Sequence, residues 1–137
     1  MKRVALLLLL AIIAGGGAEG GEVAPGALPG TLEGRTFEGP LVIGRDSMAL
    51  AFSFDIEGGE LRARLFSAAM GIYGMPADSV AIDGTTLRIA IPRLDLEFTG
   101  RLRLDANGQS IERIDGDWFQ QSEMVPVVLL PVDAPSF

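Results

Sequence analysis

The chain has 137 residues, with 18 carboxylate side chains against 11 basic ones, and it contains neither cysteine nor histidine. These two absences exclude disulfides, Ser-His-Asp and Cys-His catalytic arrangements, and Cys/His zinc sites built from this chain alone. Apolar residues make up 48% of the sequence and charged residues 21%, a composition typical of a folded globular chain. A single domain is expected at this length.

The first 18 residues have the features of a secretory signal peptide. Lys2 and Arg3 form a positive start, residues 4–14 are an unbroken apolar run, and residues 16–18 are small. An anchor helix is the alternative, but eleven apolar residues are fewer than the roughly 20 needed to cross a bilayer. We therefore expect an exported protein, periplasmic or extracellular, with no membrane span after processing.

The charge of the processed chain limits its partners. Removing the leader leaves 119 residues and changes the formal net charge from −7 to −9. This argues against nucleic acid and against an anionic membrane surface, because both recruit clustered cations. The nine remaining cations are all arginine, so Schiff-base chemistry has no lysine to use. We expect no catalysis, no cofactor and no metal site.

Residues 19–34 are rich in Gly and Pro and predict a flexible arm, whereas the following residues alternate between apolar and polar side chains. The clearest alternation runs over residues 94–104 and indicates a half-buried strand. A change of phase between Ile111 and Ile114 predicts a β-bulge near Glu112 and Arg113. In all, the pattern predicts eight strands, over residues 37–43, 48–56, 61–65, 80–82, 87–91, 94–104, 111–120 and 125–132.

Eight short strands, joined mainly by hairpin turns and each with one apolar face, predict an eight-stranded antiparallel up-and-down barrel over residues 35–134. A two-layer β-sandwich is the alternative fold. A membrane-spanning barrel would alternate in the same way, but short strands and the prolines Pro131 and Pro135 in the last segment disfavour it.

The longest connection, residues 67–76, is unusually apolar and is expected to lie over one mouth of the barrel. Methionines and aromatic residues can line a site for a small apolar ligand inside such a barrel. The candidate ligand-binding residues are Met70, Tyr73 and Met75 from this connection and Phe52, Phe54, Phe98 and Trp118 from the strands. The alternative is that the connection only seals the barrel and that the rings fill its core, with Gly39, Ala63, Gly100 and Gly116 either leaving room for a cavity or accommodating the rings.

A second candidate site lies on the outside of the predicted barrel. If Trp118 faces inward, its neighbour Phe119 points outward, and the last strand is apolar on both faces at positions such as Val128 and Leu130. These three side chains indicate an uncovered apolar strip, which either the Gly/Pro-rich arm or another protein could cover.

The order of short motifs along residues 37–133 resembles the small lipocalin-like β-domain that precedes the catalytic domain in secreted α/β-hydrolases of the serine-aminopeptidase type. Each motif is short, but together they follow the family's order over about 97 residues. They are Phe37-Glu38-Gly39, Gly59-Glu60-Leu61-Arg62-Ala63-Arg64-Leu65-Phe66-Ser67, Gly74-Met75-Pro76, Phe98-Thr99-Gly100-Arg101-Leu102, Gly116-Asp117-Trp118-Phe119-Gln120 and Val125-Pro126-Val127-Val128-Leu129.

The chain departs from that family because it has no hydrolase half. No G-x-S-x-G motif is present, so no catalytic residue of the family can be assigned to any position. The resemblance implies an accessory β-domain that exists without its own catalytic domain. We expect either a module that binds a small apolar molecule in its interior or a module that docks on a secreted α/β-hydrolase or another exported protein.

Overall fold

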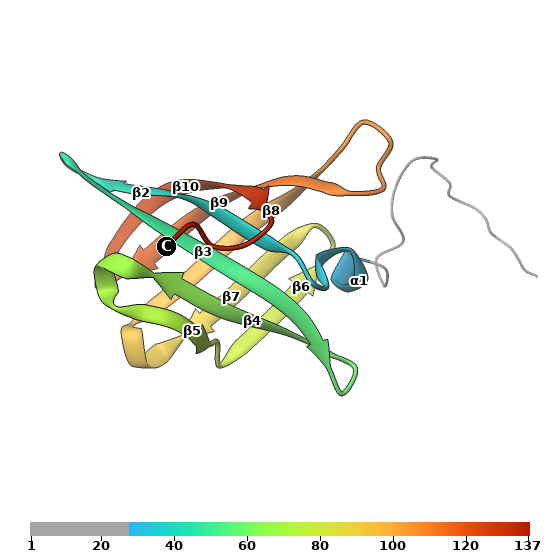
Figure 1. The fold of residues 1–137 in the computed structure, drawn as a ribbon, viewed down its shortest axis with the longest axis horizontal. Coiled ribbons are helices and arrows are strands. Elements are labelled where there is room, and N and C mark those ends of the chain that lie inside the picture. Colours follow the sequence, from blue (N-terminus) through green and yellow to red (C-terminus); the bar gives the residue numbers. More distant parts are fainter. Residues whose placement is uncertain (1–27) are drawn as a thin grey trace, which may run out of the picture.

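The structure is a computed structural model and describes residues 28–137. Over these residues the chain forms nine β-strands and one short α-helix, with single 3-10 turns at Ala68–Met70 (η4) and Pro92–Leu94 (η5) (Figure 1). The helix is α1 (Leu28–Leu32), and the strands are β2 (Thr36–Ile43), β3 (Asp46–Glu57), β4 (Glu60–Ser67), β5 (Ile72–Pro76), β6 (Ser79–Asp83), β7 (Thr86–Ile91), β8 (Leu96–Leu104), β9 (Ile111–Gln120) and β10 (Glu123–Val132).

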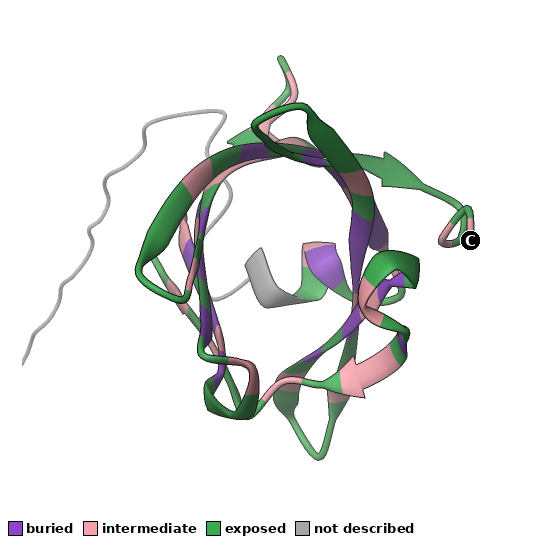
Figure 2. Cartoon of the chain, turned by 90° about the vertical axis from the view of Figure 1, so that its left-hand side faces the viewer, coloured by how far each residue is buried: buried purple, intermediate pink, exposed green. Residues whose placement is uncertain are grey.

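All nine strands belong to one antiparallel sheet in the order β5-β4-β3-β2-β10-β9-β8-β7-β6. Strands that follow one another in the sequence are neighbours within β2–β5 and within β6–β10, and the first and last strands join these two meanders. At that junction Leu130 of β10 lies opposite Glu38 of β2. The sheet curls round into a barrel-like ring (Figure 2), as the alternating pattern predicts, rather than into a two-layer sandwich.

The two edge strands, β5 and β6, follow each other in the chain and are linked by Ala77 and Asp78. The amide of Ala77 donates to the carbonyl of Ala63 on β4 over 2.9 Å, and the amide of Asp78 donates to the carbonyl of Ala90 on β7 over 2.9 Å. The linker thus bonds to a strand near each end of the sheet, and the two edge strands are short, with five residues each.

The prediction of eight strands is wrong by one, and the difference lies in residues 67–76. Instead of a loop over the mouth, this segment forms η4 and then β5, which pairs with β4. Leu65 lies opposite Met75 and Phe66 opposite Tyr73, so Gly74 is an extra residue in a β-bulge with φ +95°. The bulge interrupts the period of two, which explains why the alternation did not reveal this strand.

The second bulge was predicted and is confirmed. Arg103 of β8 lies opposite Arg113 of β9, whereas the next residue, Leu104, lies opposite Ile111. Glu112 therefore has no opposite residue on β8. The extra residue keeps both Ile111 and Ile114 buried, although they are three positions apart.

The last residues of the expected arm are folded against the barrel. Leu32 of α1 is fully buried and belongs to the core, and the helix lies across the far opening of the ring in Figure 2. The amide of Gly34 donates to the carbonyl of Phe54, and the amide of Phe54 donates to the carbonyl of Arg35, which ties the segment to β3. Residues 19–27 of the expected arm, and the expected signal peptide over residues 1–18, lie outside the described residues.

Candidate functional site

Four of the predicted ligand-binding residues meet in the interior of the barrel. Phe52, Phe54, Phe98 and Trp118 are at most 1% exposed. The ring centroid of Phe52 lies 5.3 Å from that of Phe98, 6.4 Å from that of Trp118 and 6.5 Å from that of Phe54. At these distances the rings pack directly against one another.

Side chains of the core fill the space beside the inward-facing glycines. A Cβ on Gly100 would lie 2.6 Å from Cγ2 of Ile114 and 2.9 Å from Cε2 of Phe98, and one on Gly116 would lie 2.6 Å from Cε1 of the same ring. Gly39 serves a different purpose, because a Cβ there would collide with the backbone carbonyl of Val128 on β10. Phe98 therefore fills the space beside Gly116 and, together with Ile114, the space beside Gly100. Gly39 allows β2 and β10 to approach closely.

Hydrogen bonds fix the end of the barrel near η5. The indole Nε1 of Trp118 donates to Oε1 of Gln120 over 3.1 Å, and Nε2 of Gln120 donates to the carbonyl of Leu94 over 2.9 Å. The Gln120 amide thus satisfies the buried indole and holds η5 against β9. The opposite end is occupied by α1, whose Leu32 packs into the core.

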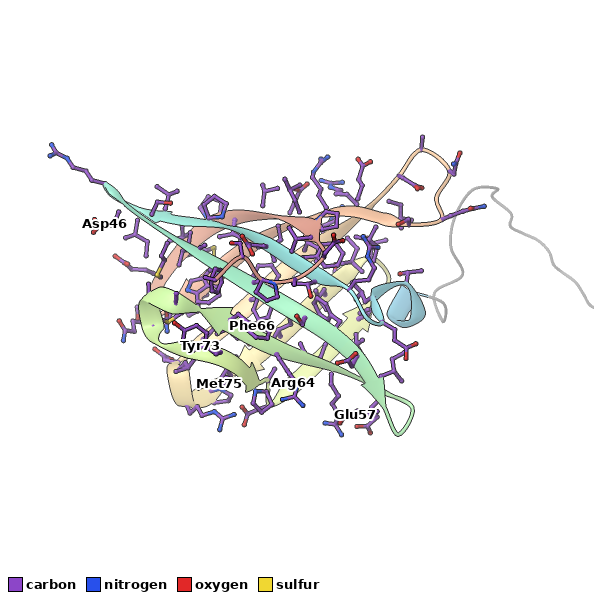
Figure 3. All side chains as sticks on the ribbon, in the orientation of Figure 1. Asp46, Glu57, Arg64, Phe66, Tyr73 and Met75 are labelled. Carbon is purple, nitrogen blue, oxygen red and sulfur yellow. The ribbon has the colours of Figure 1, made fainter. Side chains whose placement is uncertain are left out.

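The residues expected from the 67–76 connection separate into two groups. Met70 and Met75 are partly buried and pack against the core. Tyr73, in contrast, lies opposite Phe66 on the outer surface and is 64% exposed, so it does not join the interior residues (Figure 3). Ser67 precedes η4 and is fully buried, and its Oγ forms no hydrogen bond within the described part of the chain.

The outer surface is uneven in its distribution of apolar side chains. Eight large apolar side chains are exposed among the described residues, and seven of them come from the adjacent strands β2, β10 and β9. Six of these seven lie on the outer face of the sheet, and we call them the β10 face: Val42, Phe119, Met124, Val128, Leu130 and Val132. Ile43, which follows Val42 directly on β2, points to the same side of the sheet as the buried Leu41. The predicted docking residues Phe119, Val128 and Leu130 all belong to it, with exposed fractions of 38%, 47% and 52%.

The other three members of the β10 face were not predicted. On β10, the buried residues Val127 and Leu129 alternate with the exposed Val128 and Leu130, and the same alternation places Met124 and Val132 outward. This signal was present in the sequence. Val42 lies near the end of β2, where nothing in the sequence says that the neighbouring strand is β10.

A hollow of about 400 Å³ lies at one end of the β10 face. It is lined by Phe119 and Met124, which are opposite each other on β9 and β10, and by three polar side chains. Glu97 of β8 lies opposite Phe119, while Thr99 of β8 lies opposite Asp117 of β9. The hollow therefore has two apolar walls and two carboxylates.

Beside the β10 face, Asp115 binds two arginines. Its Oδ2 accepts from Nε of Arg103 over 2.8 Å, and its Oδ1 accepts from Nε of Arg113 over 2.9 Å. These hydrogen bonds, first that from Arg113 and then that from Arg103, hold the pKa of Asp115 below its usual range. The same bond to Asp115 raises the pKa of Arg113.

The C-terminal residues lie against the outside of β2. The backbone amide of Ser136 donates to Oε1 of Glu38 over 2.8 Å, and its hydroxyl donates to Oε2 over 2.6 Å. Figure 1 shows this tail passing over β3. The tail ends beside the β10 face, and the side chains of that face stay exposed.

Comparisons with known protein families, with curated proteins and with solved structures find no match for this chain. Over residues 28–137, no helix has the length and apolar character to cross a membrane. The same residues contain no group of three or more acidic side chains placed to hold a metal ion.

Proposed function

We propose that this protein is a non-catalytic interaction module that docks on another exported protein through the β10 face. The observation that carries the proposal is that, within residues 28–137, six of the eight exposed large apolar side chains lie on the outer face of three adjacent strands. Scattered single apolar residues are ordinary on a protein surface, whereas a contiguous apolar patch marks an interaction site.

The packing of the interior supports the outer surface as the place of binding. The rings of Phe52, Phe98 and Trp118 are in contact, and Phe98 also covers the two glycines that could have left a cavity. The exposed surface of a residue such as Leu130, by contrast, contributes no burial of apolar area to folding. Its burial against a partner removes apolar area from water and favours association.

The first candidate partner is a secreted α/β-hydrolase. The motifs along residues 37–133 resemble an accessory β-domain of such enzymes, and the antiparallel meander closed between β2 and β10 is compatible with a lipocalin-like barrel. The expected signal peptide would bring both proteins to the same compartment. The β-domain would then supply a docking surface and the partner the catalytic residues.

The test compares the partners of the wild type with those of two variants. In Val128→Ser/Leu130→Ser, two apolar side chains of the β10 face become polar, while Tyr73→Ser removes an exposed large apolar residue of β5, away from that face. Exported proteins of the native source that bind the wild type and Tyr73→Ser, but not the double variant, would be purified and titrated. We expect the double variant to bind at least about tenfold more weakly. Equal binding by all three proteins would contradict the proposal.

A small apolar ligand in the interior is the second candidate function, and Ser67 is the observation that favours it. Its Oγ is buried without a hydrogen-bond partner, close in sequence to the partly buried Met70. A ligand with an apolar chain and one polar atom could satisfy that hydroxyl. Titration with dodecanoate should then shift the emission of Trp118, and Ser67→Ala should weaken the binding. No change in emission, together with a filled interior in a crystal structure, would exclude this function.

A further inference from the structure

We propose that the hollow between Phe119 and Met124 binds a cationic side chain, an arginine or a lysine, that the partner presents within an apolar segment. The inference rests on the proposed function, since it places this contact at one end of the β10 face. It adds what that function leaves open, namely the chemistry of the partner.

The walls of the hollow come from two rows of cross-strand neighbours. In the first row Glu97, Phe119 and Met124 lie side by side on β8, β9 and β10. In the second row Thr99 lies opposite Asp117. Because Asp117 and Phe119 are two residues apart on one strand, they share a face, and Asp117 is the diagonal neighbour of Glu97. Both carboxylates therefore border the same aromatic ring.

Neither carboxylate is neutralised within the described part of the chain. Glu97 and Asp117 form no ion pair or hydrogen bond there, although Asp115, two residues from Asp117, is bound by two arginines. The nearest outward cations on the neighbouring strands are Arg88, opposite Thr99, and Arg101, opposite Asp115. Neither of them makes an ion pair with a carboxylate of the hollow.

The combination of surfaces fits a basic side chain better than a purely apolar one. A lysine or arginine has an apolar stem, which can lie along the Met124 side chain, and a charged head, which the face of the Phe119 ring attracts. Glu97 and Asp117 can then accept hydrogen bonds from that head. An acidic or neutral polar side chain would leave two carboxylates facing each other without a counter-charge.

A second copy of this chain is the other occupant to consider. The β10 face borders unpaired acidic side chains, and the processed chain carries an expected net charge of −9, so two copies repel each other. Arg45, in the turn between β2 and β3, is the cation nearest in sequence to Val42 and Ile43 and could reach the hollow of another copy. Light scattering of the wild type and of Arg45→Ala decides this point. A dimer that Arg45→Ala abolishes would overturn the proposal.

The direct test uses a tripeptide of valine, arginine and leucine with blocked ends, and the same peptide with citrulline in place of arginine. Citrulline keeps the shape of the side chain and removes its charge. In amide NMR spectra the arginine peptide should shift the signals of Glu97, Asp117, Phe119 and Met124. We expect the citrulline peptide to bind at least about fivefold more weakly.

Two double variants that each lose two negative charges test whether the peptide binds in the hollow or is only attracted by the net negative charge of the protein. Glu97→Gln/Asp117→Asn should weaken the arginine peptide about fivefold, whereas Glu57→Gln/Glu60→Gln, at the β3–β4 turn, should leave it unchanged. Equal binding of both peptides, equal loss in both variants, or no shift at the hollow would overturn the proposal. If a partner binds the β10 face equally well after Glu97→Gln/Asp117→Asn, this inference fails while the proposed function stands.

Discussion

The ring of Phe98 occupies the position where Gly116, on the neighbouring strand, would otherwise carry a side chain. A Cβ on Gly116 would lie 2.6 Å from Cε1 of that ring and 3.0 Å from the carbonyl oxygen of Thr99. Gly116→Ala should therefore displace Phe98 and lower the free energy of unfolding by about 1–3 kcal/mol. Urea unfolding followed by the emission of the buried Trp118 measures this loss.

Gly30→Ala is the matched control for that substitution. Gly30 lies in α1, and a Cβ there would meet no atom within 4 Å. Alanine is the better helix former, so this variant should be as stable as the wild type or more stable by up to about 1 kcal/mol. If both alanine variants changed stability equally, the close contact between Phe98 and Gly116 would not be what matters.

Truncation of two neighbouring leucines on β10 should have very different effects on stability. Leu129 is fully buried and Leu130 is 52% exposed, although they are adjacent in the chain. Leu129→Ala should cost about 2–5 kcal/mol, because it leaves a cavity in the core. Leu130→Ala should change the free energy of unfolding by about 0.5 kcal/mol or less. Comparable losses in the two variants would mean that the β10 face is covered in the isolated protein.

The alternation of apolar residues was sufficient to predict an all-β fold and eight of its nine strands, because those strands have one face in the core. Phe98, Gly100 and Leu102 on β8 and Phe52 and Phe54 on β3 are buried as the period of two requires. The same argument predicted that Trp118 faces inward and Phe119 outward. Burial on one face fixes register strongly, which is why these positions could be read from the sequence.

A break in the alternation of apolar and polar residues could be predicted only where large apolar residues lay on both sides of it. Ile111 and Ile114 did so, and the bulge at Glu112 was found. On β5, the extra residue is Gly74, and the exposed Tyr73 is itself aromatic, so the segment resembled an apolar loop. The role of Leu32 in the core was missed because the sequence around α1 is dominated by Gly and Pro.

The candidate docking residues were predictable, but the hollow beside them was not. Phe119 and Leu130 are apolar residues at outward positions, which a pattern can reveal. Glu97 and Asp117 look like ordinary solvated charges in the sequence. Only the pairing of β8, β9 and β10 brings them beside Phe119 and Met124. The local sequence pattern of one strand does not show which strands pair with it.

Gln120 should matter more for stability than its place near the end of β9 suggests. Its side chain accepts from the indole of Trp118 and donates to the carbonyl of Leu94. Gln120→Leu leaves both of these groups without a partner, so the free energy of unfolding should fall by about 1–3 kcal/mol. The emission maximum of Trp118 should move as well. The neighbouring Gln121→Leu is the control, and a loss as large as that of Gln120→Leu would contradict the role given to Gln120.

Asp115 should make the stability of the protein depend on pH in the acid range. Because Arg113 and Arg103 lower its pKa in the folded state, the stabilisation is fully present above the unfolded-state value of about 4 and is lost as the pH falls through the folded-state pKa. Asp115→Asn should lower the free energy of unfolding by about 1 kcal/mol or less at neutral pH, since the carboxylate is partly exposed. At an acid pH below the folded-state pKa, the wild type and Asp115→Asn should become nearly equal in stability.

Urea unfolding at both pH values measures that convergence, with Glu123→Gln as the control, because Glu123 forms no ion pair among the described residues. Added salt should also reduce the difference between wild type and Asp115→Asn at neutral pH, because the arginine partners are partly exposed and are screened by ions. A difference that stayed constant from neutral pH to a pH below the folded-state pKa would show that the charge of Asp115 contributes nothing. The hydrogen-bonded shape of its side chain would then be sufficient to hold β8 and β9 in register.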